Sequence, residues 1–429
     1  MSFEAFQLHS ALVSNLQRLQ FTQATPIQAQ AIPAVLSQRD LIGLAQTGTG
    51  KTAAFMLPIL QRLLEKPSNK IRALIVVPTR ELAEQIRQVA SELSRGTPIK
   101  TITIYGGVAF NPQRSNLHRG CDIVIACPGR LLDHIQQRTI DLRSVEHLVL
   151  DEADQMFDMG FLPNIRRILQ HVPKNRQSLL FSATMPPEIR RLTGEILNNP
   201  QTIQIGETAP ASTVAHALYP VPQHLKTELL IALLRDISHD SVLVFTRTKH
   251  RAKKVEKALQ KARFEVAALH GNLSQNRRQA SMQGFRSGEF QVLVATDIAA
   301  RGVDISTVSH VINYDIPDTT EAYTHRIGRT GRAQKTGDAF TLVSREDEGM
   351  IRQIERVLKA KIDRKTIASF DYTQAAAPRE PNREFQPQRR ARPAGRPHRR
   401  GGDDVRGQRS QPSSASSSYR ERSNARDWR

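Results

Sequence analysis

The chain has 429 residues, which is enough for two or three domains. Its 61 Lys and Arg against 41 Asp and Glu give a net charge of +20, which favours a polyanionic partner and most simply nucleic acid. There are only two cysteines, Cys121 and Cys127, which excludes a disulfide framework or a zinc cluster. The sequence shows no signal-peptide pattern and no apolar run near ~20 residues. It therefore predicts a cytoplasmic protein that does not cross a membrane.

The first informative element is a glycine-rich loop, predicted between an apolar strand at 41–45 and a helix at 52–64. A loop in this position cradles a polyphosphate, because its backbone N–H groups and the helix N-terminus point at the anion. We expect Lys51 to reach the β- and γ-phosphate oxygens and Thr52 to hold Mg²⁺. The other residues expected around the phosphates are Ala45, Gln46, Thr47, Gly48, Thr49 and Gly50.

Apolar runs then alternate with charged, helix-periodic runs as far as about residue 205. Such alternation predicts a parallel sheet with helices on both faces, and ligand sites outside the carboxyl ends of its strands. Further strands are predicted at 73–77, 99–105, 123–126, 147–150, 178–181 and 202–205, with helices at 79–93 and 163–171 among others.

Two carboxylates follow the strand predicted at 147–150. Asp151 is expected in the shell of the Mg²⁺ ion, and Glu152 beside it is expected to orient and deprotonate a water molecule. Together with the phosphate loop, this pair predicts hydrolysis of a nucleoside triphosphate.

A second α/β domain follows a linker-like stretch at 206–213. Its strands are predicted at 241–245, 266–269, 292–295, 310–313 and 339–343, and its helices include 225–234, 249–262 and 351–358. It has no second phosphate loop, so it must contribute something else. Residues 371–429 carry 14 Arg, 7 acids and few aliphatic residues, a composition typical of disorder. The predicted parts are a domain at 1–207, a linker at 208–215, a domain at 216–368 and a disordered Arg-rich tail at 369–429.

The order of these motifs over residues 3–360 resembles that of the DEAD-box RNA helicases, with the bacterial RhlE-type branch as the nearest likeness. The resemblance implies two tandem RecA-like parallel-sheet domains that use ATP and Mg²⁺. It also implies RNA-stimulated ATP hydrolysis, coupled by domain closure to the unwinding of short duplexes or the remodelling of RNA–protein complexes. The implied partners are RNA, bound through its backbone, and ribosome-assembly or RNA-degradation proteins, and the implied state is a monomer.

The resemblance also implies nucleotide-binding residues beyond the phosphate loop. The stretch that begins at Thr25 is similar to the family's Q motif, in which Gln28 would read adenine, and Phe3 would stack on the base. Gln20 and Ala24 stand where the family usually has Gly and Pro, which puts the loop geometry in question. In the second domain the implied residues are Gly302 and Asp304 at the ribose, and the arginine fingers Arg329 and Arg332.

RNA contacts and interdomain coupling are implied in the same way. RNA contacts are implied at Pro78, Thr79, Arg80, Gly106, Gly107, Pro128, Gly129, Arg130, Arg247, Gln275, Arg278 and Thr296. Coupling of the two domains is implied for Ser182, Thr184, Asp154 and His325. Cys127 stands where the family usually has Thr, and a thiol is a poor hydrogen-bonding substitute for a hydroxyl, so one RNA contact is expected to be weakened.

Plainer interpretations accompany these assignments. Gln28 alone would read as a surface helix residue, and Ser182 and Thr184 as helix caps. For the whole chain, the alternatives to a helicase are an ATP-gated RNA clamp with slow turnover and a DNA helicase. For the tail, the alternatives are a sequence-tolerant RNA anchor and a solvating appendage.

Overall fold

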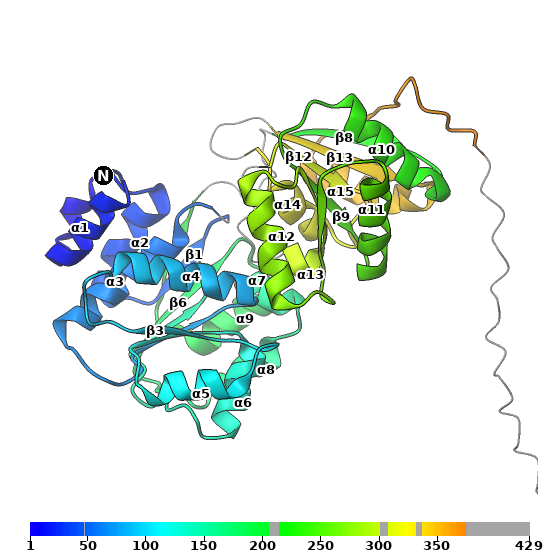
Figure 1. Cartoon of the computed structure of the whole chain (residues 1–429). Helices are drawn as coiled ribbons and strands as arrows, with labels where there is room; N and C mark the ends of the chain where they lie inside the picture. The colour runs from blue at the N-terminus through cyan, green and yellow to red at the C-terminus, as the bar shows by residue number, and fades with distance from the viewer. Residues whose placement is uncertain (47, 206–213, 301–307, 332–336, 375–429) are drawn as a thin grey trace, which may run out of the picture. The chain divides into compact units, whose positions relative to one another are not determined.

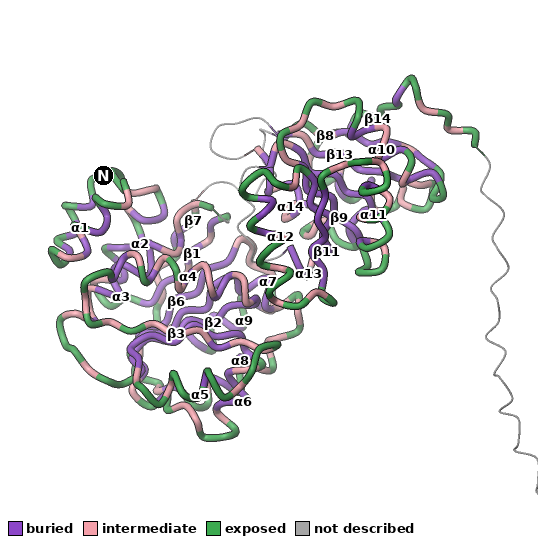
Figure 2. Tube along the Cα trace, viewed as in Figure 1, coloured by how far each residue is buried: buried purple, intermediate pink, exposed green. Residues whose placement is uncertain are grey.

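A computed structural model describes residues 1–46, 48–205, 214–300, 308–331 and 337–374. These residues belong to one compact unit that contains two separate seven-stranded sheets. Within them, no helix combines the length and the apolar character that a membrane span requires. Figure 1 labels the elements, and Figure 2 shows the central strands in purple, the colour of buried residues.

The first sheet is entirely parallel and has the strand order β3-β4-β2-β5-β6-β1-β7. Its strands are β1 Leu41–Leu44, β2 Ala73–Val76, β3 Thr101–Ile104, β4 Ile123–Ala126, β5 His147–Leu150, β6 Gln177–Ser182 and β7 Gln201–Gln204. Its helices are η1 Phe3–Phe6, α1 Ser10–Arg18, α2 Pro26–Leu36, α3 Lys51–Glu65, α4 Arg80–Leu93, α5 Phe110–His118, α6 Pro128–Gln136, α7 Ala153–Asp158, α8 Leu162–Leu169 and α9 Pro187–Ile196.

Both faces of this sheet are covered, which explains why its strands read as continuous apolar runs. Along β2, Ala73 and Ile75 pack into one hydrophobic cluster, whereas Leu74 and Val76 pack into another. Because successive side chains of a strand point to opposite faces, these two clusters are the cores above and below one sheet.

The second sheet is also parallel throughout and has the order β10-β11-β9-β12-β13-β8-β14. Counted from its own first strand, this is the strand order of the first sheet. Its strands are β8 Val214–Pro220, β9 Val242–Thr246, β10 Val266–Leu269, β11 Val292–Thr296, β12 His310–Asn313, β13 Gly337–Val343 and β14 Asp363–Arg364. Its helices are η2 Gln223–Leu225, α10 Lys226–Asp236, α11 Lys249–Lys261, α12 Gln275–Ser287, α13 Asp297–Ala300, α14 Thr320–Ile327, η3 Arg345–Asp347 and α15 Glu348–Leu358.

The predicted strands agree with the observed ones to within two residues at each end, but β8 and β14 were not predicted. Strand β8 starts at Val214, so the last two residues of the linker predicted at 208–215 are part of the second sheet, where β8 pairs with β13. The rest of that linker lies outside the described residues. Sequence alone missed β8 because its two alanines have low strand propensity and it ends at Pro220.

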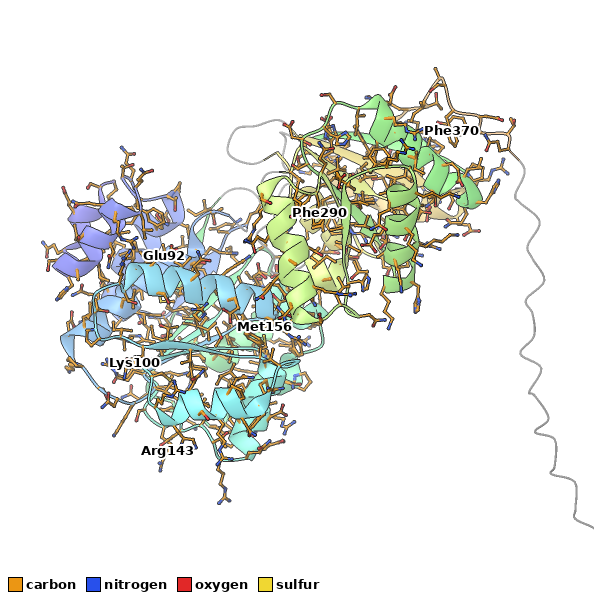
Figure 3. The ribbon with its side chains drawn as sticks, viewed as in Figure 1. Glu92, Lys100, Arg143, Met156, Phe290 and Phe370 are labelled. Carbon is orange, nitrogen blue, oxygen red and sulfur yellow. The ribbon has the colours of Figure 1, made fainter. Side chains whose placement is uncertain are left out.

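The second domain also continues past the boundary predicted at residue 368. Phe370 and Tyr372 pack against the hydrophobic core of the second sheet, their rings 4.9 Å apart and edge-to-face (Figure 3 labels Phe370). The Tyr372 hydroxyl accepts the backbone N–H of Ile367 at 3.0 Å. Tyr372, counted with the tail on sequence, is therefore a core contact of the second sheet.

Candidate functional site

The glycine-rich loop connects β1 to α3 at the carboxyl end of the sheet, as predicted. Gly48 and Gly50 have φ values of 87° and 93°, and Gly50 is the N-cap of α3. A Cβ at residue 50 would lie 2.5 Å from the Nε2 atom of Gln28. Glycine is therefore required at residue 50 both by backbone conformation and by space.

Lys51 is the first residue of α3 and is only 6% exposed. Its Nζ donates to the backbone oxygen of Ala45 at 2.8 Å, so the ammonium folds back across the loop. Thr52 follows it in the first turn and is partly exposed. Thr49 steadies the loop by donating its hydroxyl to the oxygen of Gln46 at 2.8 Å.

Gln28 joins α2 to this loop. Its Oε1 accepts the Thr25 N–H at 2.9 Å, its Nε2 donates to the Gly50 oxygen at 3.1 Å, and it is 4% exposed. The plainer interpretation of Gln28 as a surface helix residue is therefore wrong. Phe3 is also buried, and it stacks on the more exposed ring of Phe21 at 6.3 Å.

The two positions that depart from the family pattern are visible in the same region. Gln20 has a φ of 59°, the left-handed conformation for which glycine is the usual residue. The Ala24 N–H donates to the Met1 oxygen at 2.9 Å, so this segment is held by a backbone hydrogen bond.

The paired carboxylates lie at the end of β5, where both are almost fully buried. Asp151 Oδ1 accepts the Glu152 N–H at 2.9 Å, and Glu152 has a φ of 55°, which is strained for a residue with a side chain. Burial and the neighbouring Asp151 charge raise the pKa of Glu152 to about 7, against the opposing charges of Lys51 and Arg329. Burial also raises the pKa of Asp151.

One oxygen of Glu152 is poised for a further partner. Its Oε2 is buried and has no hydrogen-bond partner among the described residues. A buried carboxylate oxygen of this kind, on a group with a pKa near neutrality, is suited to accept a proton from a bound water molecule.

Asp154 is the centre of a hydrogen-bond cluster with the segment after β6. Its Oδ2 accepts the backbone N–H groups of Ala183 and Thr184 at 3.0 and 2.9 Å, and the Thr184 hydroxyl at 3.1 Å. The Ser182 hydroxyl accepts the Asp154 N–H at 3.2 Å. The Nε2 atom of His325, from α14, lies 3.8 Å from the same Oδ2. The four residues that the resemblance linked to coupling thus gather around Asp154: Thr184 and His325 lie at its carboxylate, and Ser182 lies at its backbone N–H.

The end of α14 is anchored by Arg326, which sequence reasoning passed over. Its Nε and Nη2 donate to the two carboxylate oxygens of Asp297, each at 2.6 Å, and its Nη1 donates to Asn313 Oδ1 at 3.0 Å. Its guanidinium also lies 5.0 Å from the centre of the Phe245 ring. Arg329 follows one turn later and is buried. The sequence marks a run of arginines here, but only the fold shows which of them is the buried anchor.

Four of the predicted site residues cannot be placed. Thr47, Gly302, Asp304 and Arg332 lie outside the described residues.

A second cluster gathers predicted RNA-contact residues from both sheets. Arg278 Nη2 pairs with Glu81 Oε1 at 2.9 Å, and Arg80 Nη1 lies 3.4 Å from Gln275 Oε1. A Cβ at residue 107, where φ is 76°, would collide with the guanidinium of Arg80. Gly107 is therefore required for the close approach of Arg80, and Glu81 joins a cluster in which it was not predicted.

Arg130 contacts the Gly106–Gly107 turn rather than standing free. Both of its Nη atoms donate to the Val108 oxygen at 3.1 Å, and its guanidinium lies 5.7 Å from the centre of the Phe110 ring. Pro128 and Gly129 precede it in the first turn of α6, whose N-cap Cys127 makes no side-chain capping bond. By contrast, the hydroxyl of Thr79, which follows Pro78 and caps α4, accepts the Leu82 N–H at 3.3 Å.

The remaining predicted contacts lie at strand ends of the second sheet. Thr296 is the last residue of β11, and Arg247 follows β9. The Arg247 N–H donates to Asp315 Oδ2 at 2.8 Å, and its Nε pairs with Asp318 at 3.2 Å.

The oxygen donors beside the loop suit a hard divalent cation. The Thr52 hydroxyl and the Asp151 carboxylate are ligand types that Mg²⁺ accepts. No group of three or more His, Cys, Asp or Glu able to hold a metal occurs in the part of the chain that the structure describes. Mg²⁺ keeps several water ligands and takes others from phosphates, so two oxygen donors from the protein fit its usual coordination.

Comparison with known families gives two domain matches. Residues 25–192 match the model of the DEAD/DEAH box helicase, and residues 225–334 match the helicase conserved C-terminal domain.

Individual proteins agree with these matches. The chain is 42% identical over 372 residues to the DEAD-box ATP-dependent RNA helicase CshA of Bacillus subtilis, covering 86% of this chain and 75% of that protein. The structure of S. cerevisiae Dbp5 bound to RNA and ADP BeF3 has a TM-score of 0.76 and 29% identity, covering 85% of this chain and 95% of that one. The structure of the DEAD-box helicase Mss116 bound to ssRNA and UDP-BeF has a TM-score of 0.77 and 27% identity, covering 86% of this chain and 80% of that one. The RhlE-type branch is not confirmed by these relatives.

The phosphate loop, the buried Asp151–Glu152 pair and the cluster around Asp154 lie on the tandem RecA-like fold of these relatives, and the chain belongs to the DEAD-box ATP-dependent RNA helicases, which hydrolyse ATP.

Proposed function

We propose that this chain hydrolyses ATP when its two sheets close on RNA, and so separates short RNA duplexes or remodels RNA–protein complexes. One observation carries the proposal most strongly. Glu152, with a pKa near 7 and an unpartnered buried oxygen, lies next to Asp151 and within the field of both Lys51 and Arg329. Lys51 begins α3, which packs on the first sheet, and Arg329 follows α14, which packs on the second. The charge around the proposed base therefore depends on both domains.

ATP binding is assigned to the loop and its surroundings. Lys51 neutralises the β- and γ-phosphates, and backbone N–H groups from Gln46 to Thr52 cradle them. Gln28, already fixed to the loop through Gly50, selects adenine with its amide. Phe3, beside its stacked neighbour Phe21, stacks on the adenine base. Binding of the ribose is assigned to Asp304 and Gly302.

The hydrolytic step is assigned to the paired carboxylates. Thr52 and Asp151 hold Mg²⁺, which when bound neutralises charge on the phosphates. Glu152 accepts the proton of the attacking water, since its environment poises it near neutral pH. Arg329 and Arg332 stabilise negative charge that develops on the γ-phosphate.

Coupling is assigned to the Asp154 cluster. Thr184 donates to Oδ2 of Asp154, and His325 of α14 lies 3.8 Å from the same oxygen, so movement of α14 would alter the surroundings of the segment after β6. ATP and RNA then favour one closed state, and each strengthens the binding of the other.

RNA binding is assigned to the carboxyl ends of both sheets. Backbone donors at the turns 78–80, 106–107 and 128–130 would hold phosphates. Arg80 and Arg278, held together through Gln275 and Glu81, add positive charge. The RNA is held through its backbone, with little selection of base sequence. Further proposals are a monomeric, cytoplasmic protein that works with ribosome-assembly or RNA-degradation proteins, and an Arg-rich tail that anchors RNA.

The proposal is tested by ATP turnover and strand displacement on matched RNA and DNA duplexes. RNA should stimulate turnover and RNA duplexes should be separated, whereas Lys51→Ala should lose ATP binding. Arg329→Ala should slow RNA-stimulated turnover by about 10³–10⁵, the range seen for arginine fingers. Wild-type turnover in Arg329→Ala, or equal activity on DNA duplexes, would overturn the proposal.

A further inference from the structure

Helix α11, Lys249–Lys261, carries an unusual arrangement of charge. Lys249, Lys253, Lys257 and Lys261 recur every four residues and form a row, here called the α11 lysine row. All four are exposed, and they lie opposite the face formed by Ala252, Val255 and Leu259, which is buried in the core of the second sheet.

The spacing and sign of these charges lower the stability of the helix. Like charges four residues apart repel one another on a helix surface. Basic residues also fill the first turn, where the helix dipole favours acids, and no acid lies in that turn. A sequence under selection for stability alone would interleave glutamates, so the row indicates a ligand that needs the charge.

The four positive charges of the row are only partly offset: Glu256 attracts Lys253 and Lys257, but it carries a single negative charge. None of its four ammonium groups forms an ion pair with a described residue, and Lys249 donates to the amide oxygen of Asn272 at 3.1 Å. Glu256, the only acid on the helix, is half-buried and accepts the N–H of Ala268 in β10. The segment at 371–429 carries 14 Arg against 7 acids, so its net charge has the same sign as the row.

The row starts at the edge of the sheet to which RNA binding is assigned. Strand β9 ends at Thr246, Arg247 follows it, and Lys249 begins α11. Because α11 returns along the sheet on which it packs, the row leads away from that edge over about 18 Å, at 1.5 Å per residue. Figure 1 shows α11 lying alongside β9.

We propose that the α11 lysine row binds the phosphate backbone of RNA that extends beyond the strand held at the carboxyl edge of the second sheet. Four regularly spaced ammonium groups, on a helix that carries no Phe, Tyr or Trp, suit phosphates and give no base readout. Continuity with the proposed RNA edge favours RNA over an acidic protein. The inference rests on the proposed function for the position of that edge.

The test compares wild-type protein with the triple variant Lys253→Gln, Lys257→Gln, Lys261→Gln. Gln keeps a high helix propensity and removes the charge, and Lys249 is left in place because it contacts Asn272. The matched control is Lys359→Gln, Lys361→Gln, Lys365→Gln, which removes equal charge from exposed positions elsewhere in the same half of the chain. A Lys→Arg triple at 253, 257 and 261 keeps the charge and reports on side-chain shape alone.

Binding is measured for oligouridylates of about 10 and about 40 nucleotides across a salt series. We expect unchanged affinity for the short RNA and weaker affinity for the long one in the row variant only. Loss of three phosphate contacts should flatten its log–log salt dependence by about 2. The ratio of variant to wild-type Kd on the long RNA should therefore shrink about 16-fold between about 50 and 200 mM salt. The Arg triple should bind like wild type.

The outcomes separate this inference from the function on which it rests. Failure of wild-type protein to bind the short RNA would contradict the proposed function itself. Normal short-RNA binding, with identical long-RNA curves for the wild type, the row variant and the control, would overturn the α11 assignment alone. Equal losses of long-RNA affinity in the row variant and the control variant would also overturn it, because they would show a non-specific effect of net charge. Unchanged RNA binding with lost binding of poly-glutamate would instead identify a surface for acidic protein.

Discussion

Thr184 donates both its backbone N–H and its hydroxyl to one carboxylate oxygen of Asp154, at 2.9 and 3.1 Å. His325, from a helix of the other sheet, lies 3.8 Å from that same oxygen. One oxygen therefore links the acidic motif after β5, the segment after β6 and the helix that leads to Arg329. A change at this oxygen should affect coupling more than it affects ATP binding.

Thr184→Ala removes the hydroxyl bond and keeps the backbone bond. Hydrogen bonds to charged groups contribute about 1.5–3 kcal/mol, so the attachment of the segment after β6 to Asp154 should be weakened by about that amount. RNA duplex separation should fall more than ATP affinity does. Parallel strand-displacement and ATP-binding assays measure this, with Thr193→Ala, which loses a hydroxyl bond to Arg190 on α9, as control. Equal losses in binding and unwinding would contradict the coupling role.

The pKa of Glu152 predicts a pH dependence of turnover. Burial raises it to about 7, so below that pH the carboxyl group is protonated and cannot accept a proton from water. RNA-stimulated kcat/KM for ATP should therefore rise with pH through about 7 and level off above it, because kcat/KM reports the free enzyme. A flat profile from pH 6 to 8 would contradict Glu152 as the base.

Gly50→Ala should damage the phosphate loop specifically. A side chain at φ 93° is strained, and its Cβ would press on the Gln28 amide. ATP affinity should drop sharply while the fold of the second sheet is kept. Gly194→Ala in α9, where no atom lies within 4 Å of the added Cβ, is the control in equilibrium nucleotide binding. Normal ATP affinity in Gly50→Ala would show that the loop is more tolerant than this geometry indicates.

Arg326→Ala should destabilise the second sheet. It would leave Asp297 without its two short hydrogen bonds and Asn313 without a partner for its oxygen. Breaking a fully buried ion pair by removing one member costs about 3–5 kcal/mol, and the loss here should be smaller because the Asp297 side chain is 28% exposed. Denaturant unfolding of the full chain should show an early transition. Wild-type unfolding would show that the pair contributes little to stability.

Neutralising the α11 lysine row should stabilise the protein slightly. The triple Gln variant at 253, 257 and 261 removes three repulsive pairs, each worth about 0.2–0.5 kcal/mol, and this gain should exceed the loss of the attraction between Glu256 and two of these lysines. Thermal unfolding should therefore shift upward, and the Lys359, Lys361 and Lys365 control should not follow. A lower melting temperature in the row variant would contradict the repulsion argument.

Sequence patterns predicted the architecture because both sheets are parallel and buried on both faces. Strands such as β4 and β5 are unbroken apolar runs between helices, and their limits were predicted without error. Strand β8 was missed because its two alanines have low strand propensity and it ends at Pro220. Motif spacing predicted roles for Lys51 and Glu152, and the family resemblance implied one for Asp154; the structure places all three side chains at strand or helix ends, and their roles remain predictions. The partners Glu81, Asp297 and Asn313 were missed because their contacts join segments far apart in the chain, which spacing does not reveal.

The most direct test of the account is the Glu152→Gln variant with saturating ATP and RNA. Gln fills the same space as Glu152 and cannot accept the proton of water. The account predicts ATP-dependent RNA binding at wild-type affinity, with single-turnover ATP hydrolysis slowed by about 10²–10⁴, the usual contribution of a general base. Hydrolysis within a few-fold of wild type would contradict the central claim that Glu152 is the base.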